Sequence, residues 1–137
     1  MSYNLFLDDF RSPQMAFRLI YDKRYNLQDW IVVKNFQEFI NIVKEYGVPT
    51  LVSFDHDLGD EHYDLHGSTD FLTWEEYYVF NDRTMTGYDC AKWLCDYCLE
   101  NNNKFPEYLI HSANTVGAKN IKIYIENFLK YNPDLKK

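Results

Sequence analysis

The sequence predicts an α/β fold, in which helices cover both faces of a parallel β-sheet. Short apolar runs alternate with segments whose apolar residues recur at helical spacing. This alternation is typical of parallel strands joined by helical crossovers. The chain has 137 residues, of which 46% are hydrophobic, so it can bury the core of one domain. We therefore expect a single domain over residues 1–137.

Four short apolar segments are expected to form the strands. They lack the strict polar alternation of half-exposed strands, as is usual for strands buried on both faces. The predicted strands are Asn4–Leu7, Trp30–Val33, Thr50–Phe54 and Tyr108–Ile110.

Four helices are expected between and after these strands. Pro13 suits a helix start before Met15–Tyr21, and a helix beginning at Phe36 should end at Gly47 and Pro49. The spacing of apolar residues predicts the other two helices at Thr86–Asn101 and Ala118–Tyr131.

Residues 60–83 do not fit the alternation. The segment carries seven acidic residues against one basic residue, Arg83, together with several aromatic residues. Connections of this length are uncommon in a compact domain unless they serve a function. We interpret the segment as an inserted lid or hairpin beside the site. The alternative is a surface excursion that packs elsewhere.

The charge and hydropathy of the chain restrict its partners. A net charge of −7 argues against a surface that binds duplex nucleic acid. A small phosphorylated ligand remains compatible, because a bound cation or a few local bases could hold it. No apolar stretch approaches the roughly 20 residues of a membrane span, and the N-terminus lacks a signal-peptide pattern. We expect a cytoplasmic location and no membrane partner.

Three cysteines, Cys90, Cys95 and Cys98, fall on one predicted helix. We expect reduced, buried thiols that act as small hydrophobic side chains. The alternative is a set of three soft metal ligands.

Acidic residues cluster where two of the predicted strands end. The first strand runs into Asp8 and Asp9, and the third runs into Asp55, His56 and Asp57. The carboxyl ends of parallel strands share one edge of the sheet, where ligands usually bind. Asp8, Asp9 and Asp55 would offer the hard oxygen ligands that Mg²⁺ or Mn²⁺ prefers. The alternative is that these aspartates only accept hydrogen bonds from nearby backbone N–H groups.

Two histidines at strand ends, His56 and His111, are candidates for proton transfer. Asp57 could orient a histidine or join the metal ligands. A purely structural role is the alternative for each of them. His62 and His66, in the insertion, could also contact a substrate.

The segment HSANTVGAKN follows the fourth predicted strand and leads into the last helix. It places Ser112, Asn114 and Gly117 near a helix N-terminus, which favours an anion such as phosphate. Arg11 and Lys119 could add positive charge. An ordinary helix cap is the alternative. The sequence contains no Gly-x-Ser-x-Gly, Walker or Gly-x-Gly-x-x-Gly motif, so it does not point to the enzymes that carry them.

Together, the segments LFLDDFRSP, LVSFDHDLG, TGYDCAKWL and YLIHSAN-x-VG resemble the cyclic-phosphate processing receiver-like domain. This family is a small variant of the response-regulator receiver fold found in bacteria and phages. The resemblance runs in order from Leu5 to about Leu129. Two features depart from it: the long insertion before Thr86, and Thr115 where the family more usually has proline.

The resemblance implies a three-layer, flavodoxin-like sheet with the strand order 2-1-3-4 and an acidic metal site. Asp8 and Asp9 would match the acidic pair on the first strand, and Asp55 the phospho-acceptor position. Ser112 would match the small hydroxyl residue at the end of the fourth strand. No lysine on a fifth strand follows the last helix, so ordinary phosphorelay signalling is not expected.

The family's proposed role implies a metal-dependent phosphoesterase that hydrolyses a cyclic phosphate of a nucleotide or ADP-ribose type. Two alternatives stay open. The same pocket could sequester a cyclic nucleotide without cleaving it, or Asp55 could accept a phosphoryl group as in a receiver domain.

Overall fold

The computed structural model describes residues 2–58 and 85–137, and within these ranges four strands form one parallel sheet. The strand order is β2-β1-β3-β4, as predicted. Each strand pairs with its neighbour in the same direction, so the carboxyl ends of all four lie along one edge. The strands are β1 (Asn4–Leu7), β2 (Trp30–Val33), β3 (Leu51–Phe54) and β4 (Glu107–Ile110).

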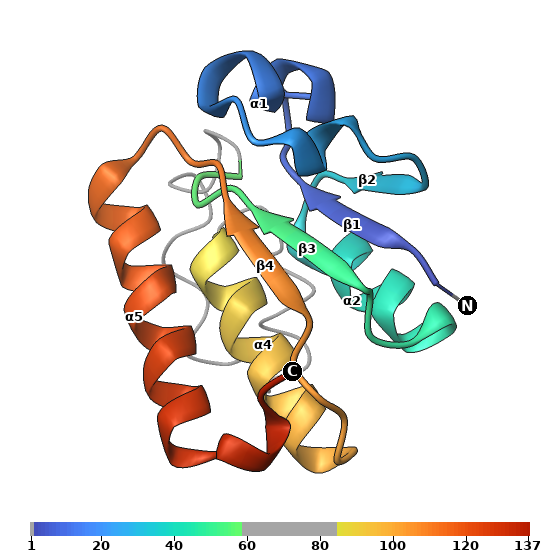
Figure 1. Ribbon diagram of the computed structural model, residues 1–137, viewed down its shortest axis with the longest axis vertical. Helices are drawn as coiled ribbons and strands as arrows, with labels where there is room; N and C mark the ends of the chain where they lie inside the picture. Colours follow the sequence, from blue (N-terminus) through green and yellow to red (C-terminus); the bar gives the residue numbers. More distant parts are fainter. Residues whose placement is uncertain (1, 59–84) are drawn as a thin grey trace, which may run out of the picture.

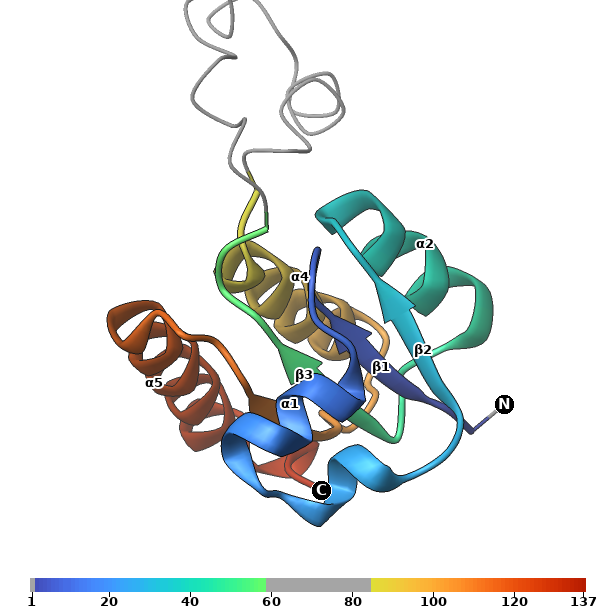
Figure 2. The same ribbon diagram turned by 90° about the horizontal axis from the view of Figure 1, so that it is seen from above.

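Helices cover both faces of this sheet, which confirms the predicted receiver-like fold. Figures 1 and 2 show α1 on one face, and α2 and α4 on the other, with α5 beside α4. The predicted lid or hairpin at 60–83 lies outside the described residues. The helices are α1 (Pro13–Ile20), α2 (Phe36–Tyr46), α4 (Gly87–Glu100) and α5 (Thr115–Tyr131), with short 3₁₀ turns η1 (Lys23–Asn26) and η5 (Pro133–Leu135).

The helices begin and end close to the predicted residues, with one instructive difference. α5 begins at Thr115, three residues before the predicted start, because the Asn114 side chain accepts a hydrogen bond from the Gly117 N–H. Such a cap satisfies a backbone donor that has no partner within the helix. The apolar spacing could not indicate this first turn, because its residues are mostly exposed.

The central strands of the sheet, β1 and β3, are buried on both faces, and the two faces have different cores. Leu5 and Leu7 pack into a larger core beneath α2, α4 and α5. Phe6 points the other way, into a smaller core with Ala16 of α1 and Tyr25 of η1. Successive strand residues alternate between faces, so both neighbours in the sequence must be apolar. This explains why the strands read as continuous apolar runs.

All three cysteines lie on the buried face of α4, as predicted. Burial raises the pKa of the Cys98 thiol to about 12 and that of the Cys95 thiol still further. A thiol must lose its proton to act as a nucleophile or a metal ligand. The cysteines therefore behave as small core residues.

The start of α4 lies directly against the end of β3. The Gly87 N–H donates to the carbonyl oxygen of His56 over 2.8 Å. A Cβ atom at Gly87 would lie only 1.6 Å from the backbone oxygen of Asp55. Glycine at this position therefore lets the helix approach the backbone that carries the polar residues of the sheet edge.

Replacing Gly87 by alanine should lower the free energy of unfolding by about 2 to 4 kcal/mol, because backbone atoms would have to move apart. Urea denaturation followed by circular dichroism measures the change. Asp96→Ala, at an exposed position of the same helix, is the control and should change stability little. Equal stability of the two variants would contradict the close contact.

Candidate functional site

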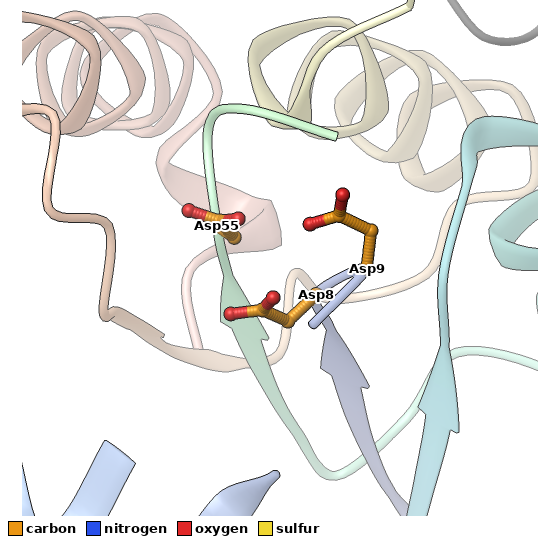
Figure 3. Close-up of side chains that lie close together, drawn as sticks. All are labelled: Asp8, Asp9 and Asp55. Atoms are coloured by element: carbon orange, nitrogen blue, oxygen red, sulfur yellow. The ribbon is translucent and has the colours of Figure 1, made fainter. Parts of the chain in front are cut away.

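The carboxyl edge of the sheet brings Asp8, Asp9 and Asp55 together. Asp8 and Asp9 follow β1, and Asp55 follows the neighbouring strand β3. Oxygen atoms from the three carboxylates all lie within 4.8 Å of one another. Figure 3 shows the carboxylates of Asp8 and Asp9 turned toward Asp55. Among the described residues, these three form a cluster that could hold a metal ion.

The carboxylate of Asp8 is held on both of its oxygens. Oδ1 accepts hydrogen bonds from the backbone N–H groups of Phe10 and Arg11, at 2.8 and 2.9 Å. Oδ2 accepts from Nε2 of His111 at 3.0 Å and from the Arg11 guanidinium at 3.3 Å. Burial disfavours the charge, but these donors outweigh burial and hold the pKa of Asp8 below its usual range.

Asp55 has the opposite electrostatic environment, although it lies beside Asp8. Burial, followed by the negative charge of Asp8, raises the pKa of Asp55 to about 6. His111, Arg11 and the Ser112 hydroxyl favour the ionised form but offset only part of this. A nearby divalent cation would supply the missing positive charge. The chemistry of the cluster therefore fits a hard cation.

A cavity of about 190 Å³ opens over the acidic cluster. It is large enough for a cation and a phosphate group, whereas small-molecule sites commonly measure about 300 to 1,000 Å³. A nucleotide would therefore extend beyond it. The lining residues are Asp8, Asp9, Phe10, Arg11, Asp55, Asp57 and Ala113.

The two candidate histidines occupy different environments. His111 is 2% exposed, stacks on Phe6 at 4.3 Å and lies between Asp8 and Ser53. His56 is partly exposed, and its Nδ1 lies 2.9 Å from Oδ1 of Asp57. If Nδ1 donates its proton to Asp57, Nε2 carries the lone pair that a general base needs. Burial therefore leaves His56 as the histidine better placed for proton transfer, while His111 supports Asp8.

The residues predicted to bind phosphate are at the same edge, but several already have partners. Arg11 lines the cavity and bridges two carboxylates, with its Nη1 at 3.3 Å from Asp8 and 3.8 Å from Asp55. Asn114 donates weakly to Asp57 at 3.5 Å and caps α5. The Ser112 hydroxyl accepts a hydrogen bond from the Asn114 N–H at 3.1 Å and also forms a hydrogen bond with the Asp55 carboxylate.

Gly117 has a steric role that the sequence did not reveal. Its N–H donates to the Asn114 cap, and a Cβ atom there would lie 2.4 Å from Cγ of the His56 ring. The absence of a side chain thus makes room for His56. Its predicted role in phosphate binding stays a prediction.

Other predicted residues do not line the cavity, or lie outside the described ranges. Lys119 is exposed on α5. His62 and His66 lie outside the described residues. Two side chains behind the cluster, Ser53 and Tyr25, were missed by the sequence analysis. The signal for Ser53 was a hydroxyl inside the buried strand LVSF, while nothing local marked Tyr25.

The chain was compared with known proteins and families. The family model described as the cyclic-phosphate processing receiver domain matches residues 3–127. Comparisons with curated proteins and with solved structures gave no match. Separately, no helix within the described ranges has both the length and the apolar character to cross a membrane.

Asp55→Asn should stabilise the cation-free protein at pH 7.5 but not at pH 4. In the folded protein the pKa of Asp55 is about 6, above its ordinary value of 3.8. The stability that the protonated Asp55 side chain contributes below pH 4 is therefore lost as the pH rises through 6. The variant has no charge to bury, and its gain at pH 7.5 should be on the order of 2 kcal/mol. Urea denaturation with a chelator measures both values.

The control for this pH dependence is Asp57→Asn, because the Asp57 side chain is 63% exposed. We expect its effect on stability to be small and similar at the two pH values. If Asp55→Asn instead loses stability equally at pH 4 and pH 7.5, burial of the Asp55 charge in the wild-type protein is not costly.

Gly117→Ala should displace the His56 ring and weaken its hydrogen bond with Asp57, because the added methyl group would overlap the imidazole. Two-dimensional NMR of the imidazole ¹H–¹³C signals measures the change. Val116→Ala, at a neighbouring exposed position, should leave these signals in place. Unchanged His56 signals in the glycine variant would refute the contact.

Proposed function

Because the chain belongs to the family of cyclic-phosphate processing receiver domains, we propose that it is a metal-dependent phosphoesterase that hydrolyses a cyclic phosphate. The observation that carries the proposal is the cluster of Asp8, Asp9 and Asp55, which lines a cavity at the carboxyl edge of the sheet. Ligand sites of open α/β sheets lie at this edge. The substrate class is taken from the family, and the chemistry from the cluster.

The three carboxylates would hold Mg²⁺ or Mn²⁺, since both prefer oxygen ligands and tolerate water and phosphate in the remaining positions. When bound, such a cation supplies positive charge that polarises the phosphate and makes water more acidic. The elements of the protein that fix the carboxylates are the ends of β1 and β3.

His56 would accept the proton of the attacking water through Nε2, with Asp57 orienting the ring through Nδ1. Arg11 lines the cavity and would contact a phosphate oxygen. The Ser112 hydroxyl is near Asp55 and would donate a hydrogen bond to another phosphate oxygen. The water oxygen then forms a bond to phosphorus as one ring P–O bond breaks, which opens the ring and leaves a phosphomonoester. The proton taken from the water is delivered to the departing oxygen.

The proposal is tested with a panel of cyclic phosphates incubated with Mn²⁺, with Mg²⁺ or with chelator, and analysed by mass spectrometry. The panel contains 2′,3′-cyclic nucleotides, 3′,5′-cyclic mononucleotides, cyclic dinucleotides and ADP-ribose cyclic phosphate. Opening of one compound, seen as the addition of one water and dependent on the cation, is the expected result. One compound bound at stoichiometric level and recovered intact would instead indicate sequestration.

Asp9→Asn should reduce turnover of the identified substrate by about 100-fold or more, because an amide oxygen lacks the charge of a carboxylate ligand. Asp9 is exposed, so the change should not disturb folding. Steady-state kinetics at saturating cation measure the effect. Asp96→Asn, an exposed aspartate on α4, is the matched control. Full activity of Asp9→Asn would remove Asp9 from the proposed ligands.

A further inference from the structure

A chain of buried side chains connects the smaller core to the acidic cluster. The Tyr25 hydroxyl lies 2.8 Å from Oγ of Ser53, which lies 2.6 Å from Nδ1 of His111. Nε2 of His111 then lies 3.0 Å from Oδ2 of Asp8. All four residues are at most 2% exposed. The chain therefore runs from η1, through β3 and the end of β4, to the end of β1.

The chemistry of Asp8 gives one end of this series of hydrogen bonds a direction. The ionised carboxylate of Asp8 can only accept, so Nε2 of His111 must carry a proton and donate it. The other ring nitrogen, Nδ1, lies 2.6 Å from the Ser53 hydroxyl, which in turn pairs with the Tyr25 hydroxyl. The ring is therefore held at both of its nitrogen atoms.

The first member of the chain is rigidly placed. The Tyr25 ring packs edge-on against Phe6 at 6.2 Å and stacks with Trp30 at 6.0 Å. Burial raises the pKa of the Tyr25 hydroxyl to about 12, so it remains a donor at neutral pH. Asp22 caps η1 by accepting from the Arg24 N–H at 2.9 Å, which holds the turn that carries Tyr25. The hydroxyl therefore has little freedom to leave Ser53.

We infer that Tyr25 and Ser53 are positioning residues, which hold the His111 ring in the orientation that donates to Asp8 and so orient this carboxylate for a divalent cation. Groups of this kind, one bond removed from the ligands, commonly change metal affinity by about 10- to 100-fold. The inference rests on the proposed function only for its effect on cation binding and turnover, because the orientation of the His111 ring is a property of the cation-free protein.

A merely structural role for the two hydroxyls would predict a different result. In that case their removal would lower stability and leave the imidazole and the cation unaffected. Tyr3 provides a matched control for Tyr25, because it is also a buried tyrosine whose hydroxyl donates, here to the carbonyl oxygen of Gly47 at 2.6 Å. Tyr3 is the residue before β1, whereas Asp8 is the residue after it, so the two lie at opposite edges of the sheet.

The experiment uses the full chain labelled with ¹⁵N. Long-range ¹H–¹⁵N spectra, recorded with chelator at pH 7.5, report the two ring nitrogens of His111 and how firmly the ring is held. Mn²⁺ affinity is measured in parallel from the electron paramagnetic resonance signal of the free ion. The variants are Ser53→Ala, Tyr25→Phe and the control Tyr3→Phe. Should Ser53→Ala fail to fold, Tyr25→Phe still tests the inference, because it keeps the ring and removes only the hydroxyl.

We expect the wild-type protein to show one set of sharp His111 ring signals. In Ser53→Ala these signals should shift and broaden, because Nδ1 loses its partner and the ring is held at Nε2 alone. Mn²⁺ affinity should fall by about 10-fold. Tyr25→Phe should produce a smaller change in the same direction, about three-fold in affinity. Tyr3→Phe should alter neither quantity.

Two outcomes would overturn the inference. One is a His111 spectrum and Mn²⁺ affinity that stay unchanged in both variants, and the other is an equal change in Tyr3→Phe. Altered His111 signals and weaker Mn²⁺ binding in the variants of a protein that opens no cyclic phosphate would support the positioning role while rejecting the proposed function. The two proposals therefore fail separately.

Discussion

The site depends on a hydrogen-bonded register that continues one residue beyond the strands. Asp8, Asp55 and His111 each donate a backbone N–H to the neighbouring strand, in each case over 3.0 Å. The first polar residues after β1, β3 and β4 therefore leave the sheet at the same level. In each strand they lie two residues after Phe6, Ser53 or Leu109, so the pleat directs all three side chains to one face. No flexible loop has to bring them together.

Because they lie at the same level, the carboxylates of Asp8 and Asp55 repel each other, and the surrounding hydrogen-bond donors stabilise one more than the other. Two buried carboxylates lie next to each other, and most of the available donors point at Asp8. Asp8 is consequently held as an anion, whereas the pKa of Asp55 is raised to about 6. Arg11 contacts both but compensates only partly. Additional positive charge would compensate these carboxylates, as in the metal site proposed for Asp8, Asp9 and Asp55.

Support for the site comes from two sides of the fold. From the smaller core, Tyr25 and Ser53 reach Asp8 through His111. From the helical layer, α4 and α5 each approach through a glycine, Gly87 against the Asp55 backbone and Gly117 against the His56 ring. The close approaches leave little room for rearrangement, because protein interiors are packed densely. A scaffold that holds the ligands rigidly is what a cation or phosphate site requires.

By itself the sequence determined the elements and the place of the site. Apolar runs that stop at Asp8 and Asp55 mark the strand ends, and the order of four motifs indicated the receiver-like family and its strand order. Only the tertiary structure decided what each polar side chain does. His111 reaches Ser53 and Asp8 across 58 and 103 residues of sequence, and Gly117 on α5 meets the His56 ring that follows β3. Periodicity reports which residues are buried locally, whereas a hydrogen-bond partner or a steric contact depends on how separate elements pack.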